Sequence, residues 1–289
     1  MNVFEVITNL QQEISILKKN KSIGFVPTMG ALHKGHLSLI KQAKKENDIV
    51  VVSIFVNPTQ FDKQEDLDKY PITIDADLKL LKSVNCDIVF IPSVKEIYKE
   101  NIQSQHFNYG GIEHEMEGKF RDGHFDGVGT IVKRLFKIVK PDKAYFGEKD
   151  FQQLQIIKKL VEIEKLPINI IGCKIFREED GLAMSSRNTR LTDQYRKAAP
   201  FIYKTLKKAK KKFGTKSANK LTKWVEKKFE KHPLLKLEYF VIANENSLKT
   251  LDEKKMKNKE RREKRKGQDY RAFLAVFAGE IRLIDNIQL

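Results

Sequence analysis

Cysteine is almost missing from this chain, since its 289 residues include only Cys86 and Cys173, each within an apolar stretch. Two thiols are too few for a disulfide framework or for a zinc site built from cysteines. We therefore expect buried, reduced thiols and a cytoplasmic protein. Uninterrupted apolar runs near 18 residues are also missing, and polar residues are scattered through the amino terminus. Because these features are missing, we expect neither export nor insertion into a membrane.

Acidic residues are scarce in one part of the chain. The formal net charge is +17, and residues 201–270, with 23 basic and 9 acidic side chains, contribute +14 of it. The excess peaks in the run Glu253–Lys266. A strongly basic segment is typical of proteins that bind nucleic acid. A solvated helix or loop explains the run more simply, so RNA binding is kept as an alternative and no nucleic acid partner is expected.

Short apolar runs alternate with amphipathic stretches through the first 176 residues. Runs rich in Val and Ile that are bounded by polar residues are typical of strands buried on both faces. Strand and helix in repetition predict a Rossmann-like, doubly wound parallel sheet. The expected strands are Ile23–Thr28, Ile49–Val56, Asp87–Pro92, Lys143–Gly147 and Ile168–Phe176.

The pattern changes after residue 176. Residues 193–231 are rich in lysine at helical spacing, with Thr192 or Asp193 as the cap. Residues 237–243 are expected to form a strand, and residues 271–287 a hairpin around Ala278 and Gly279. We expect a nucleotide-binding and substrate-binding domain at 1–176 and a smaller α+β lid domain at 177–289.

Four polar stretches follow predicted strands. They are PTMGALHKGH (27–36), NPTQF (57–61), GEKDFQQ (147–153) and REEDGLAMSSRN (177–188). In an open parallel sheet, ligands bind beyond the carboxyl ends of the strands. The four stretches are therefore expected to contribute to one site.

The first stretch has the Gly-x-x-x-x-Gly spacing of a phosphate-binding P-loop, from Gly30 to Gly35, but lacks the lysine that should follow. His33 and His36 fall on one side of an entering helix turn, where imidazoles can donate to phosphate oxygens. The helix amino terminus itself favours an anion. The alternatives are a capping turn with exposed histidines, or a zinc site, for which this segment lacks a third ligand.

Residues of the second and third stretches suit an anionic ligand and a small polar substrate. Lys149 places a flexible cation where a phosphate would arrive, and Gln153 lies one helical turn after Asp150. A plain helix cap at Asp150 is the alternative. Gln60 can donate and accept, which suits a hydroxylated or carboxylated substrate.

The fourth stretch offers two hydroxyls, from Ser185 and Ser186, beside the guanidinium of Arg187. Such a group can wrap a triphosphate. A serine-rich turn after Gly181 is the alternative interpretation.

Six motifs occur in order over nearly the whole chain: FVPTMGALHKGH, SIFVNPTQF, GHFDGVGTIV, YFGEKDFQQL, DGLAMSSRNTRL and YRAFLAVFAGEIRLID. Together they resemble the pantothenate synthetase family of the HIGH-type nucleotidylyltransferase superfamily. The resemblance implies an AMP-forming ligase of the coenzyme A pathway that joins (R)-pantoate to β-alanine through a pantoyl adenylate. It would release pantothenate, AMP and diphosphate. It also implies Mg²⁺ with the ATP, and a homodimer.

The resemblance implies roles for single residues. His33, His36 and Lys149 would be catalytic, and Gln60, Gln153 and Arg121 would bind pantoate and β-alanine. Asp75 and Asp77 lie where some relatives bind magnesium, but Ala76 and Leu80 interrupt the match, so no metal ligand is assigned. ATP would be bound by Met29, Gly30, Ala31, Leu32, His33, Lys34, Gly35, His36, Gly147, Glu148, Lys149, Asp150, Phe176, Met184, Ser185, Ser186 and Arg187.

Two alternatives of different classes stay open. One is a nucleotidylyltransferase that leaves AMP on its product, as other members of the superfamily do. The other is an RNA-binding protein built around the basic run.

Overall fold

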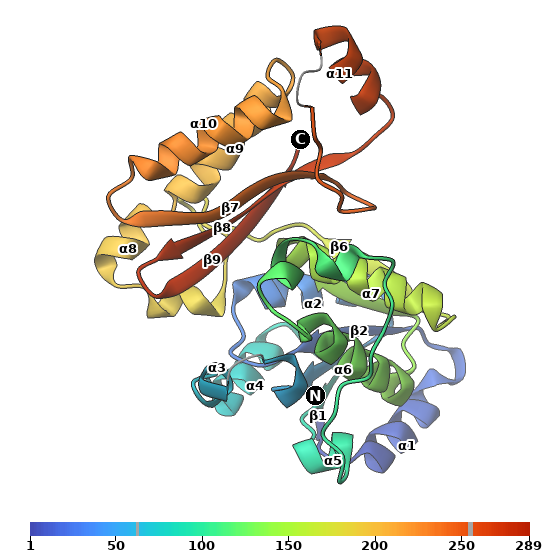
Figure 1. Ribbon diagram of the computed structural model, residues 1–289. Coiled ribbons are helices and arrows are strands. Elements are labelled where there is room, and N and C mark those ends of the chain that lie inside the picture. The colour runs from blue at the N-terminus through green and yellow to red at the C-terminus, as the bar shows by residue number, and fades with distance from the viewer. Residues whose placement is uncertain (62–63, 254–256) are drawn as a thin grey trace. The chain divides into compact units, whose positions relative to one another are not determined.

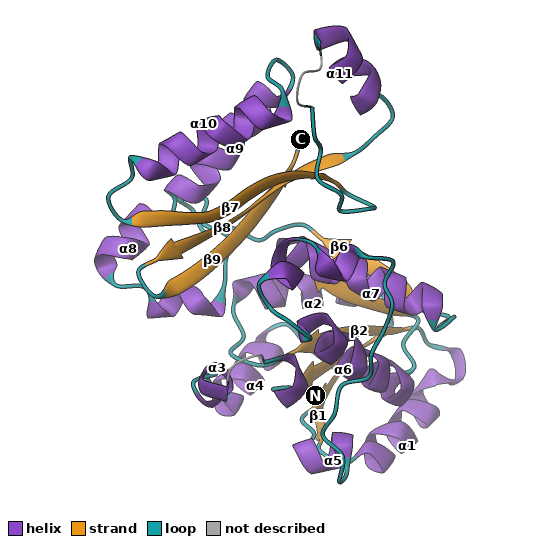
Figure 2. Cartoon of the chain, viewed as in Figure 1, coloured by secondary structure: helices purple, strands orange, loops and turns teal. Residues whose placement is uncertain are grey.

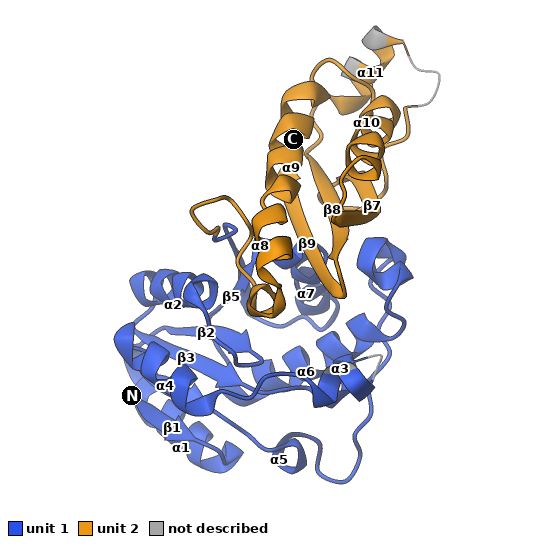
Figure 3. Ribbon diagram, turned by 90° about the vertical axis from the view of Figure 1, so that its left-hand side faces the viewer, with its two compact units in different colours: residues 1–176 blue, residues 177–289 orange. Residues whose placement is uncertain are grey.

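The computed structural model describes residues 1–61, 64–253 and 257–289. The chain divides into two compact units, Met1–Phe176 and Arg177–Leu289, which Figure 3 shows in different colours. Each unit has a sheet of its own. Within the described residues, no helix combines the length and apolarity needed to cross a bilayer.

Six parallel strands form the sheet of the first unit, as far as the chain is described, in the order β1-β4-β3-β2-β5-β6. Figures 1 and 2 show this sheet with its strands β1, β2 and β6 labelled. The predicted parallel sheet is confirmed, with strands that end earlier than expected at β3, β4 and β6. An edge strand that the sequence did not indicate, β1, pairs with β4. The strands are β1 (Asn2–Phe4), β2 (Ile23–Thr28), β3 (Ile49–Ile54), β4 (Ile88–Phe90), β5 (Lys143–Gly147) and β6 (Asn169–Cys173).

The strand order reverses between β2 and β5. From β2 the chain moves outward to β3 and β4, and it then returns to add β5 on the other side of β2. In open parallel sheets this topological switch point is where ligands bind. The loops after β2 and β5 are therefore expected to form a ligand-binding site.

Helices cover both faces of this sheet. On one face α2 and α4 bury Ile40 and Leu81 in a cluster with Val50 and Val52. On the other face Phe136 of α6 packs edge-on against Phe25 of β2, with ring centroids 6.2 Å apart. The helices are α1 (Ile7–Leu17), α2 (Lys34–Glu46), α3 (Gln64–Asp68), α4 (Ile74–Ser83), α5 (Val94–Tyr98), α6 (His124–Val139) and α7 (Phe151–Ile163).

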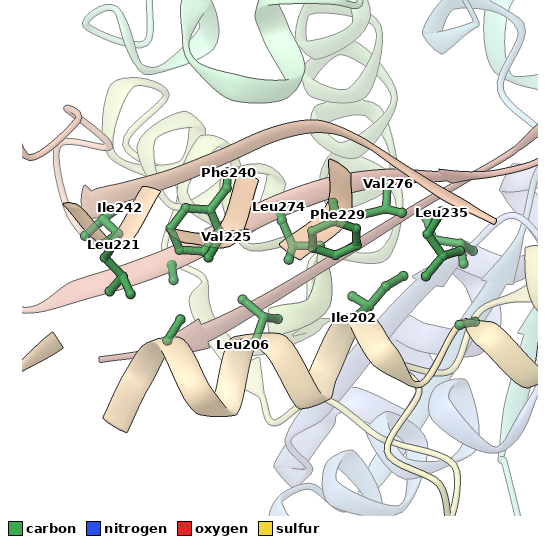
Figure 4. Packing of buried hydrophobic residues seen from close by; sticks show 14 of the residues in the cluster. Ile202, Leu206, Leu221, Val225, Phe229, Leu235, Phe240, Ile242, Leu274 and Val276 are labelled. Carbon is green, nitrogen blue, oxygen red and sulfur yellow. The ribbon is translucent and has the colours of Figure 1, made fainter. Parts of the chain in front are cut away.

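The second unit packs helices on a small antiparallel sheet, β7 (Leu235–Asn244), β8 (Tyr270–Ala278) and β9 (Ile281–Gln288). This confirms the predicted α+β architecture and the hairpin at Ala278 and Gly279. Figure 4 shows Ile202 and Leu206 of α9, and Val225 and Phe229 of α10, among the core side chains at this sheet. The lysine-rich segment 193–231, expected to be helical, contains three helices, α8 (Asp193–Ala198), α9 (Phe201–Phe213) and α10 (Ala218–Glu230). Pro200 stands at the start of α9 and Gly214 at its end.

The two ends of the basic run Glu253–Lys266 are tied together; its residues 254–256 lie outside the described chain. Arg265, at the end of α11 (Asn258–Arg265), donates from Nε and Nη2 to the fully buried Glu253 carboxylate at 2.8 and 2.7 Å. Glu253 Oε2 also accepts the N–H of Ala218, where α10 begins, at 2.7 Å. The Arg265 guanidinium lies 3.7 Å from the centre of the Phe213 ring. We call Glu253 and Arg265 the clasp, because they hold the two ends of the basic run together beside the end of α9 and the start of α10.

Candidate active site

Two histidines build the start of the helix that follows β2. His33 is the N-cap of α2: its Nδ1 accepts the Gly35 N–H at 3.1 Å, and its own N–H donates to His36 Nδ1 at 3.3 Å. The two rings stack with their centroids 4.0 Å apart. A neutral imidazole whose Nδ1 accepts carries its proton on Nε2. The capping turn considered from the sequence is present, but both histidines are half-buried and not exposed. The turn fixes both rings as Nε2–H tautomers.

The His36 ring is held neutral. Its pKa is lowered from 6.5 to about 3, chiefly because burial disfavours the charged ring, and further because His33 and Lys149 are close. Near neutral pH the ring therefore has one proton, which the capping turn places on Nε2. A neutral imidazole of this kind can donate a hydrogen bond to a developing anion but is a poor source of a proton.

Lys149 follows β5, the strand on the other side of the switch point. It lies in a 3-10 turn, Glu148–Asp150, with its side chain 18% exposed and its Nζ 3.5 Å from Asp150 Oδ1. Its charge is one cause of the lowered His36 pKa, so the loops after β2 and β5 are electrostatically coupled. Asp150 stands at the N-cap of α7 but makes no side-chain capping bond. The plain helix cap considered as the alternative therefore does not describe Asp150.

The turn after β3 is anchored by a buried asparagine. Asn57 is 1% exposed; its Nδ2 donates to Gly127 O at 3.2 Å and its Oδ1 accepts the Tyr98 hydroxyl at 2.6 Å. A side chain at Gly127 would collide with this turn, because a Cβ there would lie 2.1 Å from Thr59 O. The turn presents Gln60, whose Nε2 lies 2.6 Å from Met29 Sδ of the first loop. The loops after β2 and β3 thus meet at Gln60 and Met29.

Arg121 is held against the same turn by a histidine that the sequence did not single out. His124, 6% exposed at the start of α6, has Nε2 3.0 Å from Arg121 Nη1 and Nδ1 2.9 Å from Gln60 O. A guanidinium can only donate, so His124 Nε2 accepts, and its Nδ1–H donates to the Gln60 carbonyl. This neutral tautomer joins Arg121 to Gln60.

The first turn of α7 carries two adjacent glutamines with different environments. Gln152 is 4% exposed and pins the segment before Arg121: it donates to Ile112 O and Glu115 O at 2.9 and 2.7 Å, and accepts the Glu117 N–H at 2.9 Å. Gln153, the residue expected to bind substrate, is half-buried. Nothing in the local pattern distinguishes Gln152 as the structural residue of the two.

The fourth polar stretch belongs to the second unit, whereas the other three follow strands of the first. Gly181 has a φ of 94° in the turn that brings the Glu178 N–H to Leu182 O at 2.9 Å. Asn188 Nδ2 donates to Glu178 Oε1 at 2.7 Å. Ser185 caps the following 3-10 turn by accepting the Arg187 N–H at 3.3 Å. The serine-rich turn is therefore present, with Ser186 half-buried and the Arg187 side chain exposed.

Two of the remaining predicted ATP-binding residues are Phe176 and Met184. Phe176 is the last residue of the first unit and is 38% exposed. Met184 is half-buried in the loop of the second unit. Of the predicted residues, Met29, Gln60 and Arg121 thus meet at one turn, and His33, His36 and Lys149 are coupled at the switch point.

The carboxylates considered for magnesium do not form a metal site. Asp77 is buried and both of its oxygens accept backbone N–H groups, whereas Asp75 is exposed. Among residues 1–61, 64–253 and 257–289, no three His, Cys, Asp or Glu side chains are grouped so that they could hold a metal ion. The described residues therefore do not fit a protein-built magnesium site, and no catalytic step is assigned to one.

The doubly wound sheet, with polar loops at its switch point, places the first unit in the Rossmann-like α/β class. Comparison with known proteins identifies the family. The family profile described as pantoate-beta-alanine ligase matches residues 2–288. The chain belongs to this family, as the sequence motifs predicted.

Relatives of known name match over their whole length. The pantothenate synthetase of Christiangramia forsetii is 54% identical, with 100% of this chain and 99% of the relative covered. That of Flavobacterium psychrophilum is 55% identical, with both chains fully covered. The expected ligase class is thereby confirmed.

Solved structures of the same family share the fold. A pantothenate synthetase from Thermus thermophilus has a TM-score of 0.89 at 37% identity, covering 100% of this chain and 99% of that one. The pantoate-beta-alanine ligase of Francisella tularensis, solved with beta-gamma ATP and beta-alanine, has a TM-score of 0.80 at 38% identity, covering 100% and 97%.

Proposed function

We propose that the protein catalyses the ATP-dependent condensation of (R)-pantoate with β-alanine, giving pantothenate, AMP and diphosphate through a pantoyl adenylate. The observation that carries the proposal is the stacked pair His33 and His36 at the switch point of the sheet, with the His36 ring neutral and coupled to Lys149. It is supported by membership of the pantoate-beta-alanine ligase family and by the beta-gamma ATP and beta-alanine of the Francisella structure.

In the first half-reaction a pantoate carboxylate oxygen attacks the α-phosphorus of ATP. A new P–O bond forms and the bond to the bridging oxygen breaks, so that diphosphate leaves with its electron pair. The carboxylate is already ionised at neutral pH, so this step needs no general base. The protein must instead stabilise charge that moves onto the phosphates. The Nε2–H groups of His33 and His36 and the ammonium group of Lys149 would supply that stabilisation.

In the second half-reaction the β-alanine amine attacks the carbonyl carbon of the adenylate. The attacking amine is unprotonated: the C–N bond forms, the C–O bond breaks so that AMP leaves with its electron pair, and the nitrogen releases one proton to solvent to give the amide. The neutral His36 ring would act here as a donor to the departing AMP. Holding the two reactants together while water is excluded lowers the barrier further.

Substrate binding is assigned to the turn after β3 and the first turn of α7. Gln60, Gln153 and Arg121 would bind pantoate and β-alanine, with Arg121 suited to a carboxylate because its guanidinium donates in pairs. Met29–His36, Gly147–Asp150, Phe176 and Met184–Arg187 would bind ATP. The lid role of residues 177–289 stays a prediction from the sequence.

Three further expectations belong to the proposal. Mg²⁺ would arrive with ATP, since this ion commonly binds through substrate phosphates. The protein would act as a homodimer in the cytoplasm. Loss of activity with a chelator, regained with Mg²⁺, tests the first expectation, and light scattering tests the second.

An omission assay tests the reaction. The protein is incubated with ATP, pantoate and β-alanine, and each is left out in turn while AMP and amide are measured. AMP release that depends on both organic substrates, with one amide formed for each AMP, supports the proposal. A stable adenylylated product would instead indicate a nucleotidylyltransferase. AMP release without pantoate would refute the assignment.

A further inference from the structure

Asp77 ties the loop after β2 to a helix that lies far away in the sequence. It stands in the first turn of α4, and its side chain is almost completely buried, at 1% exposed. Its Oδ2 accepts the N–H of Ala31 at 3.0 Å, and its Oδ1 accepts the N–H of Leu32 at 2.7 Å. Both oxygens of one buried carboxylate are therefore bonded to consecutive residues of the loop.

The loop needs such an anchor because of its backbone conformation. Gly30 has a φ of 83° and Ala31 a φ of 49°, so two consecutive residues lie in the left-handed region. Glycine adopts this region readily, but alanine does so only at an energetic cost. Strain of this kind persists only where the surroundings impose it. The two bonds to Asp77 fall on Ala31 itself and on the residue after it.

The carboxylate also packs closely against the loop. A Cβ placed on Gly30 would lie 3.1 Å from Asp77 Oδ2 and 3.0 Å from Ile54 Cγ2. A side chain at position 30 would need the positive φ of Gly30 and would require Asp77 and Ile54 to shift by a few tenths of an ångström. The close packing of Asp77 is therefore a reason for glycine at position 30, in addition to the close approach of a ligand.

The anchored loop leads directly into the histidine pair. Leu32 is bonded to Asp77, and the next residue, His33, caps α2 and fixes the tautomer of His36. Five backbone N–H groups of the loop donate to acceptors within the protein. Gly30 donates to Thr28 Oγ1, and Ala31 and Leu32 donate to Asp77. His33 donates to His36, and Gly35 donates to His33. The imidazole side chains of His33 and His36 are thus the principal groups with which this loop can bind a phosphate.

We propose that Asp77 is a positioning residue for the ATP-dependent half of the reaction. It holds Gly30–Leu32 in the conformation that sets where α2 begins, and through it the position of His33 and His36. The inference rests on the proposed function, because it assigns Asp77 to the handling of ATP within that reaction. It gives this carboxylate a role in the protein other than metal binding.

The first test compares Asp77→Asn with Asp75→Asn. Asparagine keeps the size of Asp77, but its amide nitrogen cannot accept and would face a backbone N–H. Asp75 stands in the same helix turn with an exposed side chain, so its replacement removes the same charge without touching the loop. We expect Asp77→Asn to raise the KM for ATP about 10-fold or more while the KM for β-alanine changes less than about 2-fold. Asp75→Asn should leave both values unchanged.

Two results would overturn the proposal. One is a wild-type KM for ATP in a folded Asp77→Asn protein. The other is an equal rise in the KM for all three substrates, which is what a general loss of structure would produce. If the wild-type protein forms no pantothenate at all, the proposed function fails instead, so the two failures are distinguishable.

A measurement on the wild-type protein covers the case in which Asp77→Asn does not fold. Amide hydrogen exchange of Ala31 and Leu32 is followed with and without a non-hydrolysable ATP analogue. Because Asp77 already accepts both N–H groups, we expect slow exchange without nucleotide and little further slowing with it. Fast exchange without nucleotide would show that ATP orders the loop and would contradict the anchoring role.

Discussion

The His33 and His36 rings stack 4.0 Å apart, and each accepts on its Nδ1 a backbone N–H of the same helix turn. Two cations at that separation would repel each other strongly, which is one cause of the lowered His36 pKa. The pair therefore acts as two fixed Nε2–H donors. Its expected role is to stabilise charge on phosphate, which needs no transfer of a proton.

A glutamine should replace His36 better than an alanine does. The amide of His36→Gln can put an N–H near the position of Nε2, whereas His36→Ala removes the donor. We expect His36→Ala to lower kcat about 100-fold or more, and His36→Gln to retain clearly more activity. Steady-state kinetics check this, with the exposed His114→Ala as the control. Equal losses in the two His36 variants would argue for proton transfer by the imidazole.

The His36 pKa predicts how stability depends on pH. Since the folded pKa is about 3 and the ordinary value is 6.5, the unfolded chain binds a proton between these values that the folded protein does not. The free energy of unfolding is therefore full above pH 6.5 and falls as the pH drops toward 3, by up to about 1.4 kcal/mol per pH unit. Urea unfolding of wild type and His36→Gln measures the difference. An NMR titration of the ring near pH 6.5 would contradict the account.

Local patterns explain why much of the fold could be predicted from the sequence. Ile23–Thr28 was expected as a strand and is β2 with the same bounds, because an apolar run between polar residues is a strong signal. The three residues of β1 are too short for such a signal and form a strand only by pairing with β4. The helical spacing of residues 193–231 predicted helix there but not its division, which falls at Pro200 and Gly214, the two ends of α9.

His124 and Arg121 should act as a coupled pair. Replacing His124 with phenylalanine removes the acceptor of Arg121 and the donor to Gln60 O. We expect His124→Phe to lower kcat/KM for pantoate about 10-fold, and Arg121→Ala to cost less in that background than in wild type, as is usual for contacting residues. A double-mutant cycle measures this, with the exposed His106→Phe as the control. Strictly additive losses would show that the two residues act separately.

The supporting residues of the site could not be predicted from the sequence. Asp77 and Leu32 are 45 residues apart, and Gln152 and Ile112 are 40 apart. No periodicity or local spacing connects them, and they become neighbours only when the strands assemble. The motif residues His33, His36 and Lys149 could be proposed from the sequence because short, unusual sequences carry them.

The clasp predicts a stability effect without a catalytic one. Arg265→Ala would leave the fully buried Glu253 carboxylate without its cation, which typically costs about 3 to 5 kcal/mol. Urea unfolding monitored by Trp224 fluorescence would report this loss, while the KM for ATP of the folded protein should not change. Lys266→Ala, at an exposed neighbouring position, is the control. The clasp has no stabilising role if Arg265→Ala unfolds like wild type.

The adenylate route is tested most directly by labelling the carboxylate of pantoate with oxygen-18. The attack on the α-phosphorus makes one carboxylate oxygen part of the phosphate, and the attack of the amine leaves that oxygen on AMP. Mass spectrometry of the products should therefore find one labelled oxygen in each AMP and none in the diphosphate. Unlabelled AMP, with the label in diphosphate or retained in full by pantothenate, would contradict the account.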